Sequence, residues 1–126
     1  MNENEIEINK IVYVRKDTIK NNVSAKKNSK GMEYCIVRTY SAGVFAGYID
    51  RKVKGQETTI FNSRRLWYWD GANSLSDVAT NGVTKPHNCK FAVEIAETDL
   101  KQVIEVIPCT EKAEKNIKEV KIWSMT

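Results

Sequence analysis

The sequence contains few of the residues that most catalytic and metal sites need. Its 126 residues include a single histidine, His87, and three cysteines. One histidine excludes a two-histidine metal site within one chain, and the cysteines, Cys35, Cys89 and Cys109, lack the spacing of a zinc site. Each cysteine lies in or beside an apolar run, which favours buried, reduced thiols. No cofactor is indicated.

Long hydrophobic runs are also missing. No segment approaches the ~20 apolar residues that cross a bilayer, and the acidic first residues differ from a signal peptide. The motifs G-x-S-x-G, G-x-x-x-x-G-K-[ST] and G-x-G-x-x-G are absent as well. A cysteine paired with His87, or general acid–base work by the acidic residues of 94–105, is a weaker interpretation. We therefore expect a cytosolic protein that binds rather than reacts.

The positive charge is unevenly placed. The net charge is +4, and within residues 10–30 seven basic residues accompany a single acidic one, Asp17. The basic residues are Lys10, Arg15, Lys16, Lys20, Lys26, Lys27 and Lys30. This stretch is either a solvated segment or an arm that attracts phosphate. We divide the chain into residues 1–31, a strand over 6–14 followed by the basic segment, and a domain over residues 32–126.

Alternating side chains predict that this domain is rich in β-strands. In residues 32–40 the alternation gives two distinct faces, and Gly47 in the following strand indicates a bend or a close backbone approach. In residues 89–95 the same alternation places the side chains of Cys89, Phe91, Val93 and Ile95 inward. The expected strands cover residues 32–40, 44–53, 58–69, 89–95 and 102–107.

Two short helices are predicted from capping signals. Ser74 is an N-cap with Asp77 three residues later, and Gly82 ends the helix. Thr110 caps a final helix whose apolar residues recur at helical spacing. The expected fold is therefore a single α+β domain built on an antiparallel β-sheet with two short helices.

Residues 63–78, SRRLWYWDGANSLSDV, carry the clearest binding signal. In a strand, Arg65, Trp67 and Trp69 share one face, whereas Arg64 lies on the other. Indole rings stack on nucleobases, and the guanidinium fork matches a phosphate with two hydrogen bonds. Alternatively, the tryptophans belong to the core or to an interface, with arginine packed over them by cation–π contact.

Three segments are similar to a known family. The segments 35–49 (CIVRTYSAGVFAGYI), 64–79 (RRLWYWDGANSLSDVA) and 103–117 (VIEVIPCTEKAEKNI) resemble the phage-encoded Thoeris anti-defence proteins of the first-described family. The similarity covers roughly residues 32–120. These proteins are small "sponges", which sequester a signalling molecule without converting it.

The resemblance implies a ligand and an assembly. Such proteins bind cyclic ADP-ribose isomers, among them glycocyclic ADP-ribose, made by the Toll/interleukin-receptor-domain (TIR) enzymes of bacterial Thoeris defence. In the cytoplasm of the bacterial host they hold the messenger intact, so that the effector that destroys NAD is not activated. Members form homodimers with ligand pockets at the subunit interface, and dimers assemble further, up to a hexamer. Some relatives also hold cyclic di- or trinucleotides at a separate site.

Chemistry and motif position together indicate candidate contacts for such a ligand. Stacking is assigned to Phe45, Trp67 and Trp69; phosphate binding to Arg38, Arg64 and Arg65; contacts with ribose or the adenine edge to Tyr40 and Asn73. Since Arg64 and Arg65 face opposite ways in a strand, one of them is expected to serve a second site, the subunit contact or the core.

Two other classes of function stay open. One is a small module that binds single-stranded nucleic acid with the same aromatic residues and the basic segment. The other is an enzyme that degrades the messenger. For the sponge, neither a membrane nor a nucleic-acid polymer is an expected partner.

Overall fold

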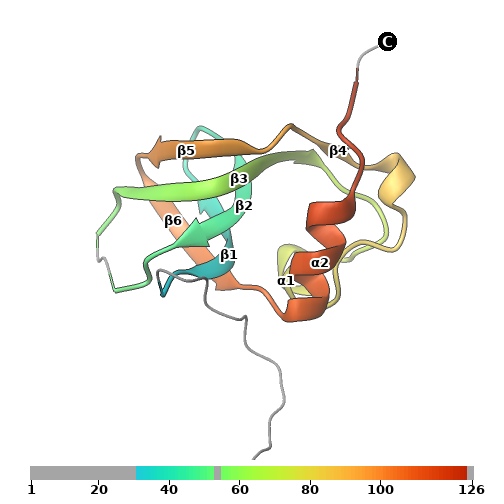
Figure 1. Cartoon of the computed structure of the whole chain (residues 1–126), viewed down its shortest axis with the longest axis horizontal. Coiled ribbons are helices and arrows are strands. Elements are labelled where there is room, and N and C mark those ends of the chain that lie inside the picture. Colours follow the sequence, from blue (N-terminus) through green and yellow to red (C-terminus); the bar gives the residue numbers. More distant parts are fainter. Residues whose placement is uncertain (1–30, 53–54, 125–126) are drawn as a thin grey trace, which may run out of the picture.

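Six β-strands and two α-helices build the domain, in a computed structural model that describes residues 31–52 and 55–124. The elements are β1 (Glu33–Thr39), β2 (Val44–Ile49), β3 (Thr58–Tyr68), α1 (Leu75–Asn81), the 3₁₀ turn η1 (Pro86–Asn88), β4 (Lys90–Phe91), β5 (Ile95–Leu100), β6 (Val103–Pro108) and α2 (Glu111–Glu119). Figure 1 shows their arrangement. The predicted α+β class is confirmed. The strand expected over residues 6–14 and the basic segment lie outside the described residues.

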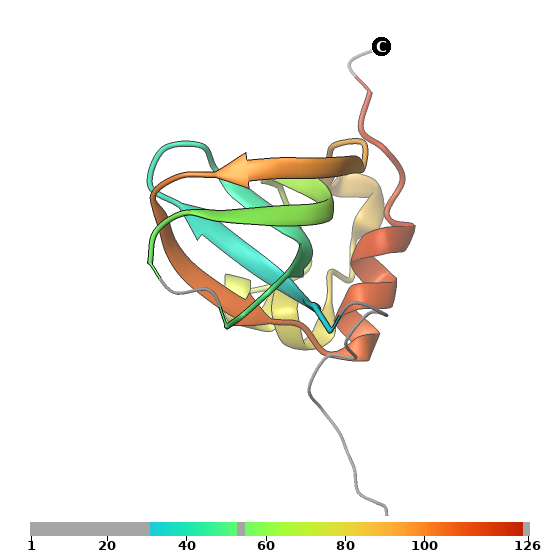
Figure 2. The ribbon, with the colours of Figure 1, turned by 60° about the vertical axis from the view of Figure 1, so that its left-hand side comes forward.

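The sheet is antiparallel and strongly curved. Its strand order is β4-β3-β2-β1-β6, and β5 pairs with the first half of β3 while β4 pairs with the second half. The consecutive strands β5 and β6 therefore lie at opposite ends of the sheet, yet only residues 101 and 102 separate them. The sheet must curl to bring these ends together, and it forms a partly closed barrel (Figure 2).

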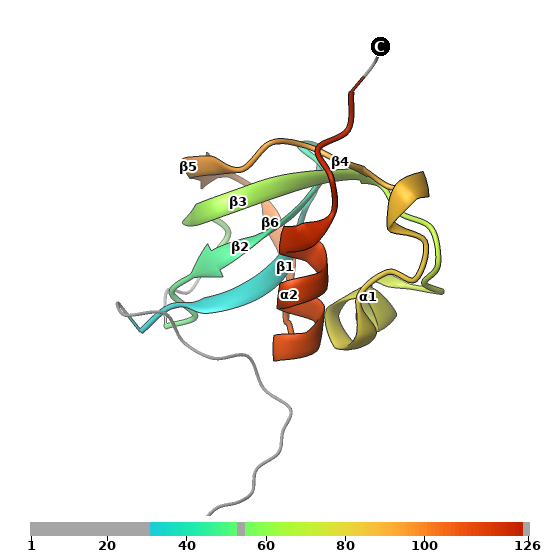
Figure 3. The same ribbon diagram turned by 45° about the vertical axis from the view of Figure 1, so that its right-hand side comes forward.

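Both faces of the sheet are buried. On the concave face, Cys35 and Val37 of β1 join Phe45 and Leu100 in a small barrel core. On the convex face, side chains such as that of Ile36 pack beneath α1 and α2, which lie side by side (Figure 3). The two faces predicted for residues 32–40 are thus confirmed, and burial on both sides explains why β1 is so apolar.

The predicted helix caps are confirmed. The Ser74 hydroxyl accepts a hydrogen bond from the Asp77 amide at 3.2 Å, and the Thr110 hydroxyl accepts one from the Ala113 amide at 3.1 Å. Gly82 ends α1 with φ 79°. A side chain at Gly82 would lie 2.5 Å from the side chain of Asn116 on α2, so this glycine also lets the two helices approach each other.

The strand predicted over residues 89–95 is wrong. Only Lys90 and Phe91 form β4, and a separate strand, β5, begins at Ile95. The apolar alternation was misleading because Cys89 and Phe91 enter the core beneath the helices, whereas Val93 and Ile95 are about half exposed. The strand β5 escaped prediction because it lies at an edge of the sheet and most of its side chains are exposed.

A β-bulge in β3 decides which residues face which core. Tyr48 pairs with Phe61 but Ala46 pairs with Arg64, so β3 has one more residue than β2 between the two pairs. Within this interval Asn62 has φ 49°. A one-residue insertion inverts the alternation of side chains. Ile60 and Arg65 therefore both face the concave side.

The bulge needs Gly47, as the close approach predicted there suggests. A Cβ atom at this position would lie 2.7 Å from the Cβ atom of Ser63 and 2.9 Å from the carbonyl oxygen of Phe61. Gly47 has no positive φ, so the requirement is one of space rather than of backbone conformation.

We expect Gly47→Ala to destabilise the protein by about 1–3 kcal/mol through overpacking. In an open strand position the same change would stabilise by roughly 0.5–1 kcal/mol, so the sign of the effect is diagnostic. Urea denaturation followed by circular dichroism measures it. A variant as stable as the parent would show that the bulge does not depend on this contact.

Candidate functional site

Arg65 lies against two aromatic rings on the concave side of the sheet. Its guanidinium carbon is 4.7 Å from the centroid of the Phe45 ring and 5.4 Å from that of the Trp67 ring. Phe45 is buried, whereas Trp67 is 60% exposed. A cation held against a buried ring has a restricted orientation, and the exposed indole beside it is available for stacking.

A cavity of about 200 Å³ opens beside this cluster. Residues from β2, β3, β5 and the β4–β5 connection line it. They are Phe45, Ser63, Arg65, Trp67, Ala92, Val93, Ile95 and Thr98. Most sites for drug-sized ligands measure ~300–1,000 Å³. This cavity can hold a ring or a phosphoryl group, but not a whole dinucleotide.

The hydrogen-bonding capacity of Arg65 is not fully used. Its Nε–H is buried and has no partner among the described residues. An unsatisfied buried donor costs about 1–3 kcal/mol. The positive charge of Arg65 and the apolar rim of Val93 and Ile95 make the cavity suited to a flat, partly anionic ligand.

Arg64, in contrast, is part of the fold. Its side chain is only 4% exposed, on the opposite face of β3. It donates hydrogen bonds to the carbonyl oxygens of Ala92 (2.7 Å), Phe91 (3.2 Å), Ile117 (2.8 Å) and Val120 (2.6 Å). Burial lowers the pKa of this guanidinium, but an arginine remains charged at neutral pH. The prediction that Arg64 binds phosphate is therefore corrected, because its donors are spent on backbone carbonyls.

Trp69 does not share a site with Trp67. The strand ends at Tyr68, so the alternation that would place Trp69 beside Trp67 does not continue. The Trp69 ring is half-buried and packs against the core beneath the helices. This matches the alternative in which a tryptophan of this stretch belongs to the core.

The other predicted contacts lie apart from the cavity. Arg38 forms an exposed ion pair with Glu105 at 2.8 Å, and Tyr40 is 77% exposed at the turn between β1 and β2. The backbone N–H of Asn73 donates to the Asp77 carboxylate at 3.1 Å, next to the α1 cap. None of Arg38, Tyr40 and Asn73 lines the cavity beside Arg65.

Five lining residues were not predicted. Ser63 lies in the bulged interval of β3, Ala92 and Val93 lie in the β4–β5 connection, and Ile95 and Thr98 lie in β5. These small or apolar residues have no chemical signature. Only the pairing of β5 with β3 brings them to the site.

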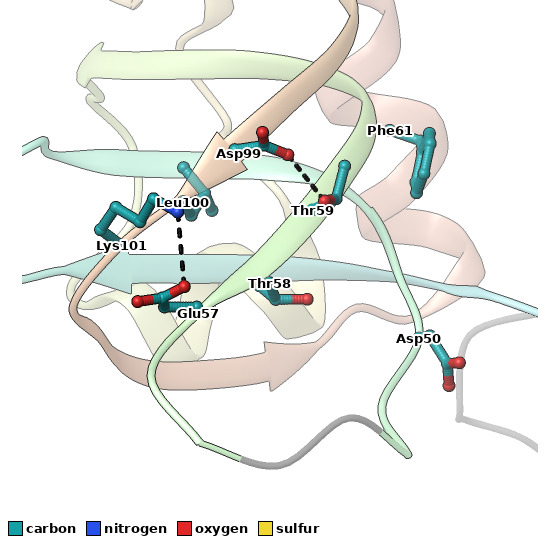
Figure 4. Close-up of a pocket in the computed structure, with 8 residues that line it drawn as sticks. All are labelled: Asp50, Glu57, Thr58, Thr59, Phe61, Asp99, Leu100 and Lys101. Atoms are coloured by element: carbon teal, nitrogen blue, oxygen red, sulfur yellow. Dashed lines mark hydrogen bonds and ion pairs between the residues drawn. The ribbon is translucent and has the colours of Figure 1, made fainter.

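A second, larger cavity has the opposite electrostatic character. It measures about 420 Å³ and lies between the first residues of β3 and the last of β5 (Figure 4). Its lining includes the carboxylates of Asp50, Glu57 and Asp99 but only one cation, Lys101, which is paired with Glu57 at 3.4 Å. Excess negative charge repels phosphate, so this cavity does not suit a nucleotide.

The cysteine thiols are shielded by burial. All three cysteines are buried and free, and burial raises the pKa of Cys35 to about 12. Burial also raises the pKa of Cys89 and of Cys109. Over the ranges 31–52 and 55–124 no group of three or more histidine, cysteine, aspartate or glutamate side chains could hold a metal ion. No helix within those ranges has the length and apolar character to cross a membrane.

The cysteines should resist alkylation in the native state. At pH 7.5 their thiols are protonated, and only the thiolate reacts. We expect iodoacetamide to leave the folded protein unmodified over minutes and to label all three cysteines in urea, as read by mass spectrometry. Rapid labelling of one cysteine in the folded protein would contradict the raised pKa values.

Comparison with known proteins identifies one family. A family model described as a domain of unknown function, DUF6948, matches residues 32–117, which is more than half of the chain. No curated protein and no solved structure matches the chain.

Proposed function

The chain belongs to the DUF6948 family, a domain of unknown function, and we propose that it is a non-catalytic protein that captures cyclic ADP-ribose isomers without cleaving them. The observation that carries the proposal is the Arg65 guanidinium, which lies against Phe45 and Trp67 and keeps an unpaired donor beside an open cavity. The resemblance to phage Thoeris anti-defence proteins supplies the ligand class. In the host cytoplasm, captured messenger would not reach its effector.

The chemistry of the cavity fits this ligand. Stacking of an adenine on Trp67 contributes about 1–3 kcal/mol, and the Arg65 fork can pair with the pyrophosphate. Arg65 is the only ionisable residue among the eight that line the described cavity. A wall of aliphatic and aromatic side chains with one arginine can bind a nucleotide, but it offers no general acid or base.

The size of the cavity supports capture by more than one subunit. Nanomolar affinity, which a sponge needs to compete with a receptor, corresponds to about 12 kcal/mol. A cavity of about 200 Å³ encloses only part of the ligand, and its rim exposes Trp67, Val93 and Ile95. We propose that a second copy closes this rim in a homodimer, and that dimers assemble into a hexamer. Cyclic di- or trinucleotides at a separate site belong to the same proposal.

Incubation with a cyclic ADP-ribose isomer, followed by heat denaturation, tests capture against cleavage. We expect the isomer to disappear from the free pool and to return intact when the protein unfolds, as measured by chromatography and mass spectrometry. Recovery of linear ADP-ribose would identify an enzyme. Affinity that rises with strand length and falls steeply with salt would identify a single-stranded nucleic-acid module instead.

Two tryptophan variants form a matched pair. We expect Trp67→Ala to weaken binding about tenfold or more, from the stacking energy lost, with little change in melting temperature. Trp69→Ala should lower the melting temperature, because the ring packs in the core, and leave the affinity of the folded fraction unchanged. Calorimetric titration and sizing chromatography measure both effects. Normal binding by a folded, oligomeric Trp67→Ala variant would show that the site lies elsewhere.

A further inference from the structure

We propose that Arg64, which no ligand in the cavity can contact, is a positioning residue that holds the cavity wall in place. The effect of Arg64 on binding rests on the proposed function, whereas its hydrogen bonds to the wall do not. The wall is the segment that leaves β4 and enters β5, and it contributes Ala92, Val93 and Ile95 to the lining.

The segment has only a short ladder with the sheet. The strand β4 contains two residues, and its pairing with β3 is limited to Phe91 with Leu66 and Lys90 with Tyr68. Residues 92–94 belong to no strand. So short a ladder fixes register weakly, and the position of the wall also depends on other contacts. One is the Trp123 amide, which donates to the Phe91 carbonyl at 3.0 Å; the Arg64 side chain supplies others.

Both the amide and the carbonyl of Ala92 are hydrogen-bonded to neighbouring arginines of β3. The Ala92 amide donates to the backbone carbonyl of Arg65 at 2.9 Å. The Ala92 carbonyl accepts from the Arg64 Nε–H at 2.7 Å, and the Phe91 carbonyl accepts from an Nη of the same guanidinium at 3.2 Å. The wall is thus fixed relative to β3, the strand that carries Arg65 and Trp67 into the cavity.

The guanidinium is itself anchored to α2. Its other Nη donates to the carbonyls of Ile117 and Val120, at 2.8 Å and 2.6 Å, at the C-terminal end of the helix. The last carbonyls of a helix lack intrahelical partners and form the negative end of its dipole, so a cation is favoured there. Because α2 packs on the core through Ala113 and Ile117, the wall is tied to a rigid part of the fold.

Only arginine can make this set of contacts. Four carbonyls in two separate segments are reached by a planar fork with five N–H donors, and lysine offers one nitrogen at the end of a flexible stem. A lysine therefore retains the charge and the stem, but its single nitrogen cannot bridge the carbonyls of both segments as the guanidinium does. Arg65 thus contacts the ligand, and Arg64 positions the wall.

Arg64→Lys tests the inference, with Val78→Ala as a control that weakens the same core without touching the wall. Hydrogen exchange is measured first, without ligand, at a temperature where both variants are folded. In Arg64→Lys we expect the Ala92 amide and the first amides of β5 to exchange at least tenfold faster than in the parent, while the amides of β1 and β2 change as they do in Val78→Ala. A uniform change across the sheet would overturn the proposal.

Affinity for the cyclic ADP-ribose isomer is measured second, by calorimetric titration. We expect at least a tenfold loss in Arg64→Lys and less than a twofold change in Val78→Ala at matched stability. A folded Arg64→Lys variant that binds normally would overturn the role in binding. If the parent binds no isomer, the proposed function fails, whereas the exchange experiment still decides the structural role.

A measurement on the parent protein covers the case in which Arg64→Lys does not fold. The Nε–H of Arg64 should give a separate nuclear magnetic resonance signal that exchanges with water at least tenfold more slowly than that of the exposed Arg38. Equal exchange rates would show that the guanidinium does not hold the Ala92 carbonyl.

Discussion

A one-residue bulge in β3 is the constraint on which the two cores and the cavity depend. Because it inverts the alternation at Asn62, Ile60 and Arg65 face the barrel side while Arg64 faces the helices. The bulge requires the bare backbone of Gly47 opposite Ser63, where a Cβ atom would approach to 2.7 Å. One steric condition therefore decides which of two adjacent arginines faces the barrel core.

The two environments have opposite energetic consequences. A guanidinium enclosed beneath the helices is stable only when its donors are paired, and Arg64 meets this condition with four carbonyls. Arg65 keeps a buried N–H without a partner in the described part of the chain. An unpaired buried donor is uncommon in a folded protein, because folding alone gains nothing from it.

The two cavities differ in the charge of their linings. The larger one is rich in carboxylates, whereas the smaller one has a single cation among aromatic and aliphatic side chains. The basic and acidic side chains of residues 31–52 and 55–124 balance, so the local lining rather than the net charge distinguishes the two cavities. Of the two linings, that of the smaller cavity is the one that does not repel an anion.

The sequence by itself determined the class of fold, the helices with their caps at Ser74 and Thr110, and the opposite orientation of Arg64 and Arg65, since capping and alternation are local properties of the chain. Of the eight candidate contacts it indicated, Phe45, Arg65 and Trp67 line one cavity. Tertiary structure alone decided which arginine faces that cavity and which residues form its wall. The physical reason is that the bulge and the pairing of β5 with β3 arise from contacts between segments distant in sequence, and no local pattern records them.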